Sequence, residues 1–87
     1  MSRDRSEGEI KDTLRRYLCR DIIKNEAYPL KDDDPLLSGG LIDSFSLVYI
    51  AVFIEKQFAV RIPDTELTIE TMDTIDAMAA RILRESP

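Results

Sequence analysis

The sequence predicts an all-α fold, a four-helix bundle of three main helices and one short helix with a long first loop. Apolar residues recur at helical spacing in three segments, at about residues 7–24, 44–58 and 74–83. The segment 25–43 carries two prolines, three consecutive aspartates and two adjacent glycines, all of which interrupt regular structure. No internal repeat or linker divides the chain, so we expect one domain over residues 1–87, with residues 1–5 disordered.

The first helix is expected over residues 7–24. Its buried face is formed by apolar residues at helical spacing: Ile10, Leu14, Tyr17, Leu18 and Ile22. Ser6, with Glu9 three residues later, is a capping-box pair that marks the start of the helix. Cys19 lies among basic residues, which can lower the pKa of a thiol, but a buried and inert thiol is the simpler interpretation.

A loop of about 19 residues, 25–43, follows the first helix. Loops of this length in compact domains are usually functional or packed by their own side chains. We expect this packing from Tyr28, Leu30, Leu36, Leu37 and Leu41. Gly39 and Gly40 are expected to supply the backbone freedom of the turn before the next helix. The run Asp32–Asp34 does not fit an EF-hand, because Leu37 stands where that loop needs glycine, so we interpret the run as a solvated acidic turn.

The second helix is expected from Ser44 to about Gln57 or Phe58, with Asp43 as its N-cap. Its core stripe consists of Leu47, Ile50, Ala51, Ile54 and Phe58. A second stripe consists of Phe45, Tyr49, Val52 and Lys56. A small bundle cannot bury the whole circumference of a helix, so we predict that the second stripe is a partner-binding surface. Packing of this stripe against another helix is the alternative.

The remaining residues are predicted to close the bundle. Residues 60–62 form a short extended run, and residues 64–69 supply at most one short helical turn. The last helix is expected from near Asp73 or Thr74 to about Leu83. Core positions in this region are Met72, Ile75, Met78, Ala79 and Ile82.

The composition excludes several classes of function. With 17 acidic and 12 basic residues the net charge is -5, which argues against nucleic-acid binding because phosphates require basic residues. One cysteine excludes an internal disulfide, and the absence of histidine removes the usual general base and the commonest metal ligand. The apolar run 47–54 is too short to span a bilayer, and the first residues lack the apolar core of a signal peptide. We therefore expect a cytoplasmic monomer without a metal site, without membrane insertion and without catalytic residues of its own.

Asp43 and Ser44 stand where the loop meets the second helix. The first amide groups of a helix have no intrahelical partners, and the helix dipole places partial positive charge there. A phosphate ester on Ser44 would therefore be stabilised by about 0.3–1 kcal/mol. The alternative is that these two residues only cap the helix, as Asp and Ser often do.

The residues around Ser44 form a wider pattern. Asp43-Ser44 precedes a bulky apolar residue and an amphipathic helix, and then come Val60-Arg61-Ile62-Pro63-Asp64 and Thr74-Ile75-x-x-Met78. Over about residues 30–83 this order and spacing resemble the acyl carrier proteins. The resemblance implies that a phosphopantetheinyl transferase attaches 4'-phosphopantetheine to Ser44, with Asp43 assisting recognition. It also implies a cargo-loading ligase or acyltransferase, downstream acceptor enzymes such as synthases, and a stand-alone carrier that holds its cargo as a thioester and is not an enzyme.

Two departures from the fatty-acid carriers narrow this interpretation. Those carriers usually have Gly-x-Asp-Ser, whereas Leu41-Ile42 precedes Asp43 here, which is more similar to D-alanyl carriers and other stand-alone carriers of secondary metabolism. They also present acidic side chains along the second helix, whereas Ser46, Tyr49 and Val52 occupy the matching positions here, so partner recognition should depend on apolar contact. We expect an acyl-type cargo. The alternatives are an aminoacyl or peptidyl carrier of a nonribosomal peptide or D-alanylation pathway, and an unmodified helical interaction module.

Overall fold

A computed structural model describes residues 6–85, and its helices follow the predicted order. The elements are α1 (Glu7–Tyr17), its π-helical continuation η1 (Leu18–Ile22), α2 (Ser46–Phe58), the 3₁₀ turn η2 (Asp64–Glu66), α3 (Ile69–Met72) and α4 (Ile75–Glu85). Residues 6–85 contain no strand, so the all-α four-helix fold is confirmed. None of the helices described is long and apolar enough to cross a membrane. The disorder expected for residues 1–5 concerns residues outside the described range.

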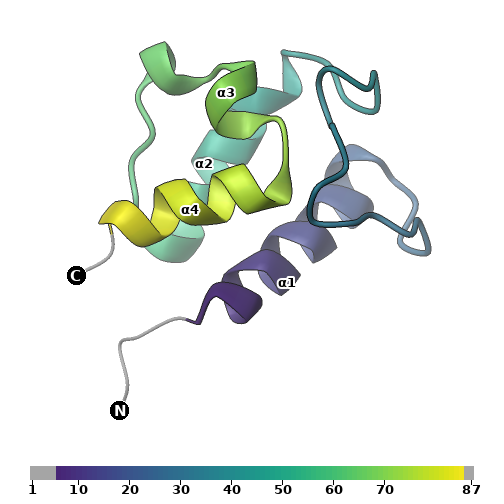
Figure 1. The fold of residues 1–87 in the computed structure, drawn as a ribbon, viewed down its shortest axis with the longest axis horizontal. Coiled ribbons are helices and arrows are strands. Elements are labelled where there is room, and N and C mark those ends of the chain that lie inside the picture. Colours follow the sequence, from purple (N-terminus) through teal and green to yellow (C-terminus); the bar gives the residue numbers. More distant parts are fainter. Residues whose placement is uncertain (1–5, 86–87) are drawn as a thin grey trace.

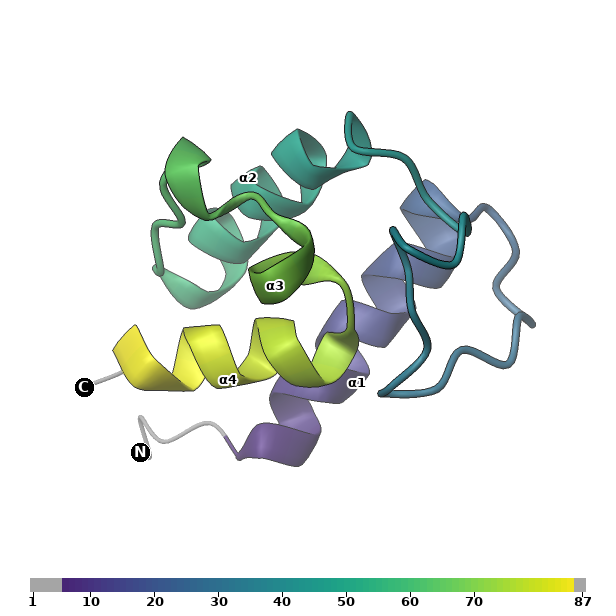
Figure 2. The same cartoon turned by 45° about the horizontal axis from the view of Figure 1, so that its top comes forward.

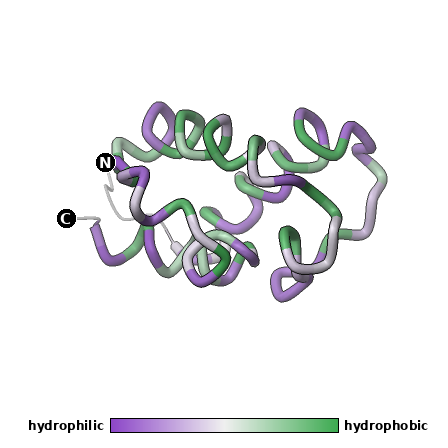
Figure 3. The backbone as a smooth tube through the Cα atoms, turned by 90° about the horizontal axis from the view of Figure 1, so that it is seen from above, coloured by the Kyte–Doolittle hydropathy of each residue, from purple (hydrophilic) through white to green (hydrophobic). Residues whose placement is uncertain are grey.

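The helices enclose one core, and the connection from η1 to α2 covers one side of it (Figure 1). Both α1 and α3 pack against α4. In Figures 1 and 2 the long connection begins at the end of the first helix that is remote from the N-terminus and leads back to the start of α2. Apolar and polar residues alternate along the helices in Figure 3, as the amphipathic patterns require. The largest fully buried side chains are Ile10, Leu14, Leu18, Leu36, Ile50, Ile54, Met72, Ile75, Met78 and Ile82.

The first helix begins as the capping pair predicts and ends slightly earlier. The Ser6 hydroxyl accepts a hydrogen bond of 3.1 Å from the Glu9 N–H, which satisfies one of the unpaired amides of the first turn. From Leu18 the helix continues with π-type bonds, so the predicted end at residue 24 was two residues too far. Cys19 is buried, its thiol faces the Tyr28 carbonyl oxygen at 3.7 Å, and burial raises the pKa of the thiol. The prediction of a buried thiol is confirmed.

Helix α2 buries the stripe predicted for it, with one exception. Leu47, Ile50, Ile54 and Phe58 are buried, whereas Ala51 is only half-buried. Ala51 instead lines a groove of about 220 Å³ between α2 and residues 61–67, because the chain returning from α2 does not cover this side of the helix completely. The helix ends at Ala59, which adopts the left-handed conformation, with φ 58° and ψ 35°.

The segment between α2 and α4 contains two short helical pieces, η2 and α3, where the sequence predicted at most one turn over residues 64–69. An ion pair anchors this segment, because the carboxylate of Glu66 in η2 accepts hydrogen bonds from the buried guanidinium of Arg81 in α4. The Arg81 hydrogen bonds lower the pKa of Glu66. Helix α4 starts at Ile75, and the Thr74 hydroxyl caps it by accepting a bond of 2.9 Å from the Ala77 N–H.

The long connection is packed by the residues predicted for that role. Leu30 and Leu36 are buried, and the partly buried side chains against the core include Tyr28, Leu37 and Leu41. The interpretation of the aspartate run as solvated was wrong for Asp32. Its carboxylate pairs with Arg15 of α1 and its carbonyl oxygen accepts a 3.0 Å bond from the Asp76 N–H, so it joins the loop to two helices. Among the described residues, no group of three or more His, Cys, Asp or Glu side chains is placed to hold a metal ion.

Candidate functional site

Ser44 lies in an exposed turn immediately before α2. The sequence placed the start of this helix at Ser44, but the α-helix begins at Ser46. The reason is that the first bonds are of the tighter i to i+3 type: the N–H groups of Ser46 and Leu47 donate to the carbonyl oxygens of Asp43 and Ser44, at 3.1 and 3.2 Å. Ser44 therefore stands in a tight turn outside the regular helix, with its side chain toward solvent.

The carboxylate of Asp43 caps this turn. Its Oδ1 atom accepts a hydrogen bond from the Ser46 N–H and another from the Ser46 hydroxyl, both at 3.2 Å. A cap of this kind supplies the acceptor that the first amides of a helix require. The capping oxygen is thus that of Asp43, whereas Ser44 takes part in the turn through its backbone carbonyl. This geometry weakens the alternative in which the Ser44 hydroxyl exists to cap the helix.

An open groove of about 410 Å³ lies beside Ser44. Its walls come from the loop before Ser44, from the start of α2 and from the segment leading into α3. The lining residues are Leu37, Ile42, Asp43, Ser44, Leu47, Leu67, Thr68 and Ile69. Most of these side chains are apolar, so the groove offers a hydrophobic surface directly next to the exposed hydroxyl.

The exposed side of α2 is strongly apolar. All four residues of the predicted partner stripe are exposed, with exposed fractions of 79% for Phe45, 65% for Tyr49 and 46% for Val52. The structure adds Val48, which is 55% exposed. Val48 lies three residues after Phe45, and this helical spacing could have predicted its place on the same face. We call Phe45, Val48, Tyr49 and Val52 the α2 face.

Phe53 belongs to neither of the two stripes that were assigned to the second helix from the sequence. Its ring stacks on that of Tyr17, with the ring centroids 4.0 Å apart and the planes 8° from parallel. The Tyr17 hydroxyl also donates a hydrogen bond of 3.2 Å to the Tyr49 carbonyl oxygen. Burial, with the nearby Asp21 carboxylate, raises the pKa of Tyr17. This stacked pair therefore packs α2 against α1, while the residues of the α2 face remain exposed.

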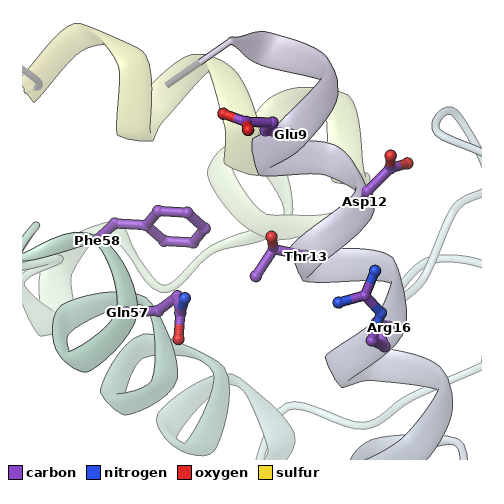
Figure 4. A pocket seen from close by; sticks show the side chains of 6 residues that line it. All are labelled: Glu9, Asp12, Thr13, Arg16, Gln57 and Phe58. Atoms are coloured by element: carbon purple, nitrogen blue, oxygen red, sulfur yellow. The ribbon is translucent and has the colours of Figure 1, made fainter. Parts of the chain in front are cut away.

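A second groove, of about 370 Å³, lies at the other end of α2. Its lining comes from Glu9, Asp12, Thr13 and Arg16 on α1 and from Gln57 and Phe58 in the last turn of α2. In Figure 4 Glu9 and Thr13 point toward the side of α2, whereas Asp12 points away from it. The lining is mainly charged and polar. Because Ser44 precedes the first turn of the same helix, this groove does not belong to the site around Ser44.

Asp73, between α3 and α4, holds the loop that leads to Ser44, a contact that no local pattern of residues marks. Its carboxylate Oδ1 accepts bonds from the N–H groups of Leu37 and Ser38, at 2.7 and 2.9 Å, and Oδ2 accepts a 2.7 Å bond from the Ser38 hydroxyl. Its carbonyl oxygen accepts a further bond of 2.7 Å from the Leu36 N–H. Partial burial favours a higher pKa for Asp73, but the bonds from Ser38 and Leu37 outweigh it and the pKa is lowered.

Comparison with known proteins gives these features a common meaning. The family model described as the phosphopantetheine attachment site matches residues 10–82. The chain belongs to this family. It is therefore a carrier of 4'-phosphopantetheine, a group that such domains hold covalently, and domains of this family generally act as carriers without catalytic activity. The acyl carrier protein resemblance is confirmed at this level.

One solved structure is similar over most of the carrier. It is described as "Crystal structure of FAD-dependent dehydrogenase", and the match has 30% sequence identity and a TM-score of 0.70. The match covers 79% of this chain and 97% of the other, so the matched chain is shorter than the present one. The comparison with curated proteins gave no match.

The residues around Ser44 fit the covalent group that the family carries. The Ser44 side chain is exposed, the cap of the turn is supplied by Asp43, and the groove beside it is open. The amide groups at the start of α2 favour a phosphate at this position. The structure thus offers a hydroxyl that can be esterified without dismantling the turn.

Proposed function

We propose that Ser44 is the attachment residue and that the chain is an acyl carrier protein. The observation that supports this most directly is the exposed Ser44 hydroxyl in a turn whose cap is made by the carboxylate of Asp43. Asp43 has two roles in this proposal: it fixes the turn, and it presents a carboxylate to the transferase beside the reacting hydroxyl. When attached, 4'-phosphopantetheine supplies a terminal thiol that holds the cargo as a thioester.

The groove beside Ser44 supports an acyl-type cargo. Leu37, Leu47 and Ile69 give it apolar walls, and an alkyl chain transferred from water to such a surface gains about 0.8 kcal/mol for each CH₂ group buried. An aminoacyl cargo carries an ammonium group, which would lose hydration against these apolar walls. The charged residue of the lining is Asp43, whose carboxylate already accepts the two bonds that cap the turn. The aminoacyl or peptidyl alternative is favoured only if the native cargo proves to be polar.

The α2 face is the proposed docking surface for partner enzymes. These would be the phosphopantetheinyl transferase, a cargo-loading ligase or acyltransferase, and downstream acceptors such as synthases. Phe45 adjoins Ser44 in sequence, and Tyr49 and Val52 extend the apolar area along α2, with Lys56 at its far end. Because the face itself carries no acidic side chain, we infer partners with an apolar docking surface and a weak dependence of docking on salt.

An FAD-dependent dehydrogenase is a candidate acceptor enzyme. The similar solved structure is described by that name, yet the chain that matches is shorter than this small carrier. A chain of that size is too short for the two βαβαβ halves of a dinucleotide-binding fold. We infer that a flavoenzyme could act on cargo tethered to the present carrier.

The buried free thiol of Cys19 is compatible with a reducing compartment, and we place the carrier in the cytoplasm as a monomer.

Mass spectrometry tests the attachment residue. Incubation with coenzyme A and a phosphopantetheinyl transferase of broad specificity should add the mass of one arm to the wild-type chain. The Ser44→Ala variant should gain nothing, whereas Ser46→Ala, the matched control two residues away, should still be modified. A mass gain in Ser44→Ala would move the attachment site elsewhere. Wild-type protein that stays unmodified would favour the unmodified interaction module.

A charge placed on the α2 face tests the docking surface. We expect Tyr49→Glu to impair modification and cargo transfer while leaving helical circular dichroism unchanged, because the side chain is 65% exposed. Ala80→Glu, on an exposed position of α4, introduces the same charge as a control and should leave transfer unchanged. Equal transfer by the Tyr49 variant and the wild type would exclude this position from the docking surface.

A further inference from the structure

Asp73 makes four hydrogen bonds to three consecutive loop residues. Its carboxylate accepts bonds from the Leu37 N–H, the Ser38 N–H and the Ser38 hydroxyl, at 2.7, 2.9 and 2.7 Å, and its carbonyl oxygen accepts one from the Leu36 N–H at 2.7 Å. Bonds to a charged acceptor are stronger than neutral ones. The junction of α3 and α4 therefore holds the loop at residues that lie about 35 positions away in the sequence.

The connection continues from the loop to Ser44. The Leu36 carbonyl oxygen accepts bonds from the N–H groups of Leu41 and Ile42, at 2.9 and 3.0 Å, which closes residues 36–42 into one tight unit. Leu36 is completely buried and Ile42 is 8% exposed, so both ends of the unit are anchored in the core. Only Asp43 separates Ile42 from Ser44. A displacement of this unit would therefore displace the Ser44 hydroxyl.

We propose that Asp73 is a positioning residue for phosphopantetheinylation: its carboxylate fixes the loop unit 36–42 and thereby the place of the Ser44 hydroxyl. The inference rests on the proposed attachment at Ser44. In that reaction the Ser44 oxygen forms a bond to the pantetheine-bearing phosphate of coenzyme A. The bond from that phosphate to the adenosine bisphosphate leaving group breaks, and the hydroxyl proton passes to a base of the transferase or to water.

Positioning and docking can be separated, because they involve different parts of this chain. The residues of the α2 face make none of the four bonds to Asp73, so the transferase should still dock when the carboxylate is removed. The reacting oxygen, in contrast, would no longer be held. A misplacement of about 1 Å can lower a reaction rate by about 100-fold. Loss of the carboxylate should therefore appear in kcat rather than in KM.

The decisive experiment measures transferase kinetics with wild-type, Asp73→Ala, Asp73→Asn and Asp33→Asn proteins. We expect Asp73→Ala to lower kcat by about 10-fold or more and to change KM by less than about twofold. Asp73→Asn should recover most of kcat, because the amide oxygen can still accept both backbone N–H bonds. Asp33→Asn removes one negative charge at an exposed position of the same connection and should match the wild type.

Amide hydrogen exchange provides a readout that a general loss of stability would not reproduce. In Asp73→Ala the amides of Leu37 and Ser38 should exchange faster, while those in the middle of α1 and α4 keep their protection. Ser38→Ala removes only the hydroxyl bond, so it should fold normally and lower kcat by about two- to threefold. If Asp73→Ala does not fold, Ser38→Ala decides the matter: the expected loss of kcat supports the positioning role, and a wild-type kcat overturns it.

The outcomes distinguish the positioning role from the proposed function. A wild-type chain that is not modified would overturn the attachment at Ser44 itself. Normal modification of the wild type, with kcat of both Asp73→Ala and Ser38→Ala equal to the wild-type value, would overturn only the positioning role. A loss confined to KM would assign Asp73 to docking and would also contradict the proposal.

Discussion

Two phenylalanines, Phe45 immediately before α2 and Phe53 within it, should affect different properties of the carrier. Phe45 is 79% exposed, and burial of a phenylalanine side chain contributes about 1.5–3 kcal/mol, so covering its exposed part in a complex contributes about 1–2 kcal/mol. Phe45→Ala should therefore lower kcat/KM for partner enzymes by about 5- to 30-fold. The unfolding temperature should hardly change, because the side chain has little contact to lose in the free carrier.

Phe53→Ala should show the reverse effect. Removal of a fully buried phenylalanine costs about 3–5 kcal/mol, but Phe53 is half-buried, so we expect about 2 kcal/mol including the loss of its stack on Tyr17. For a domain of this size that corresponds to a fall of about 8–16 °C in the unfolding temperature. Transfer kinetics measured well below that temperature should match the wild type.

Thermal unfolding by circular dichroism and transfer kinetics, measured on both variants, provide the test. Our assignment of the two sides of α2 would be refuted if Phe45→Ala lowered the unfolding temperature by about 8 °C or more. It would equally be refuted if Phe53→Ala reduced transfer while its unfolding temperature stayed at the wild-type value.

Three further predictions concern the backbone and one carboxylate. Ala59→Gly should raise the unfolding temperature by about 2–8 °C, because φ is 58° at this position and glycine adopts that conformation more readily. Gly39→Ala should lower it, since an added Cβ would lie 2.3 Å from the Pro35 carbonyl oxygen. The pKa of Asp73 is lowered in the folded chain, so its contribution to stability is complete above pH of about 4 and is lost as the pH falls through the folded pKa. In an NMR titration the Ser38 amide shift should follow this pKa, with a midpoint below the usual pKa of an aspartate, and the transition should be absent in Asp73→Asn.

The sequence was informative wherever burial repeats with the period of a helix. Four of the five positions in the predicted core stripe of α2 are buried, because their spacing forces them onto one side of the helix. The exposure of Phe45, Tyr49 and Val52 followed from the same geometry, since the helix has more apolar surface than the bundle can cover. The N-cap of the first helix could also be predicted, because Ser6 accepts its hydrogen bond from Glu9, only three positions away.

Features that depend on hydrogen-bond register or on distant contacts could not be predicted from the sequence. The Asp43 cap serves a 3₁₀ turn as well as an α-helical one, so the sequence could not distinguish a start at Ser44 from one at Ser46. Likewise, the apolar spacing of the first helix continues into residues 18–22, where the bonds become π-type. Asp73 bonds a loop about 35 residues earlier in the chain, and no local pattern marks such a contact.

The arrangement of caps explains how one turn can be both rigid and open to modification. If the Ser44 hydroxyl were the cap, esterification would remove a bond that contributes about 1 kcal/mol to the helix. The cap is instead the Asp43 carboxylate, which binds the N–H and the hydroxyl of Ser46. Attachment at Ser44 therefore leaves both bonds in place, and the new phosphate adds negative charge where the first amides of α2 favour it. The same turn can thus hold its shape before and after the proposed attachment, so an enzyme docked on the proposed α2 face would meet the point of attachment in a fixed position.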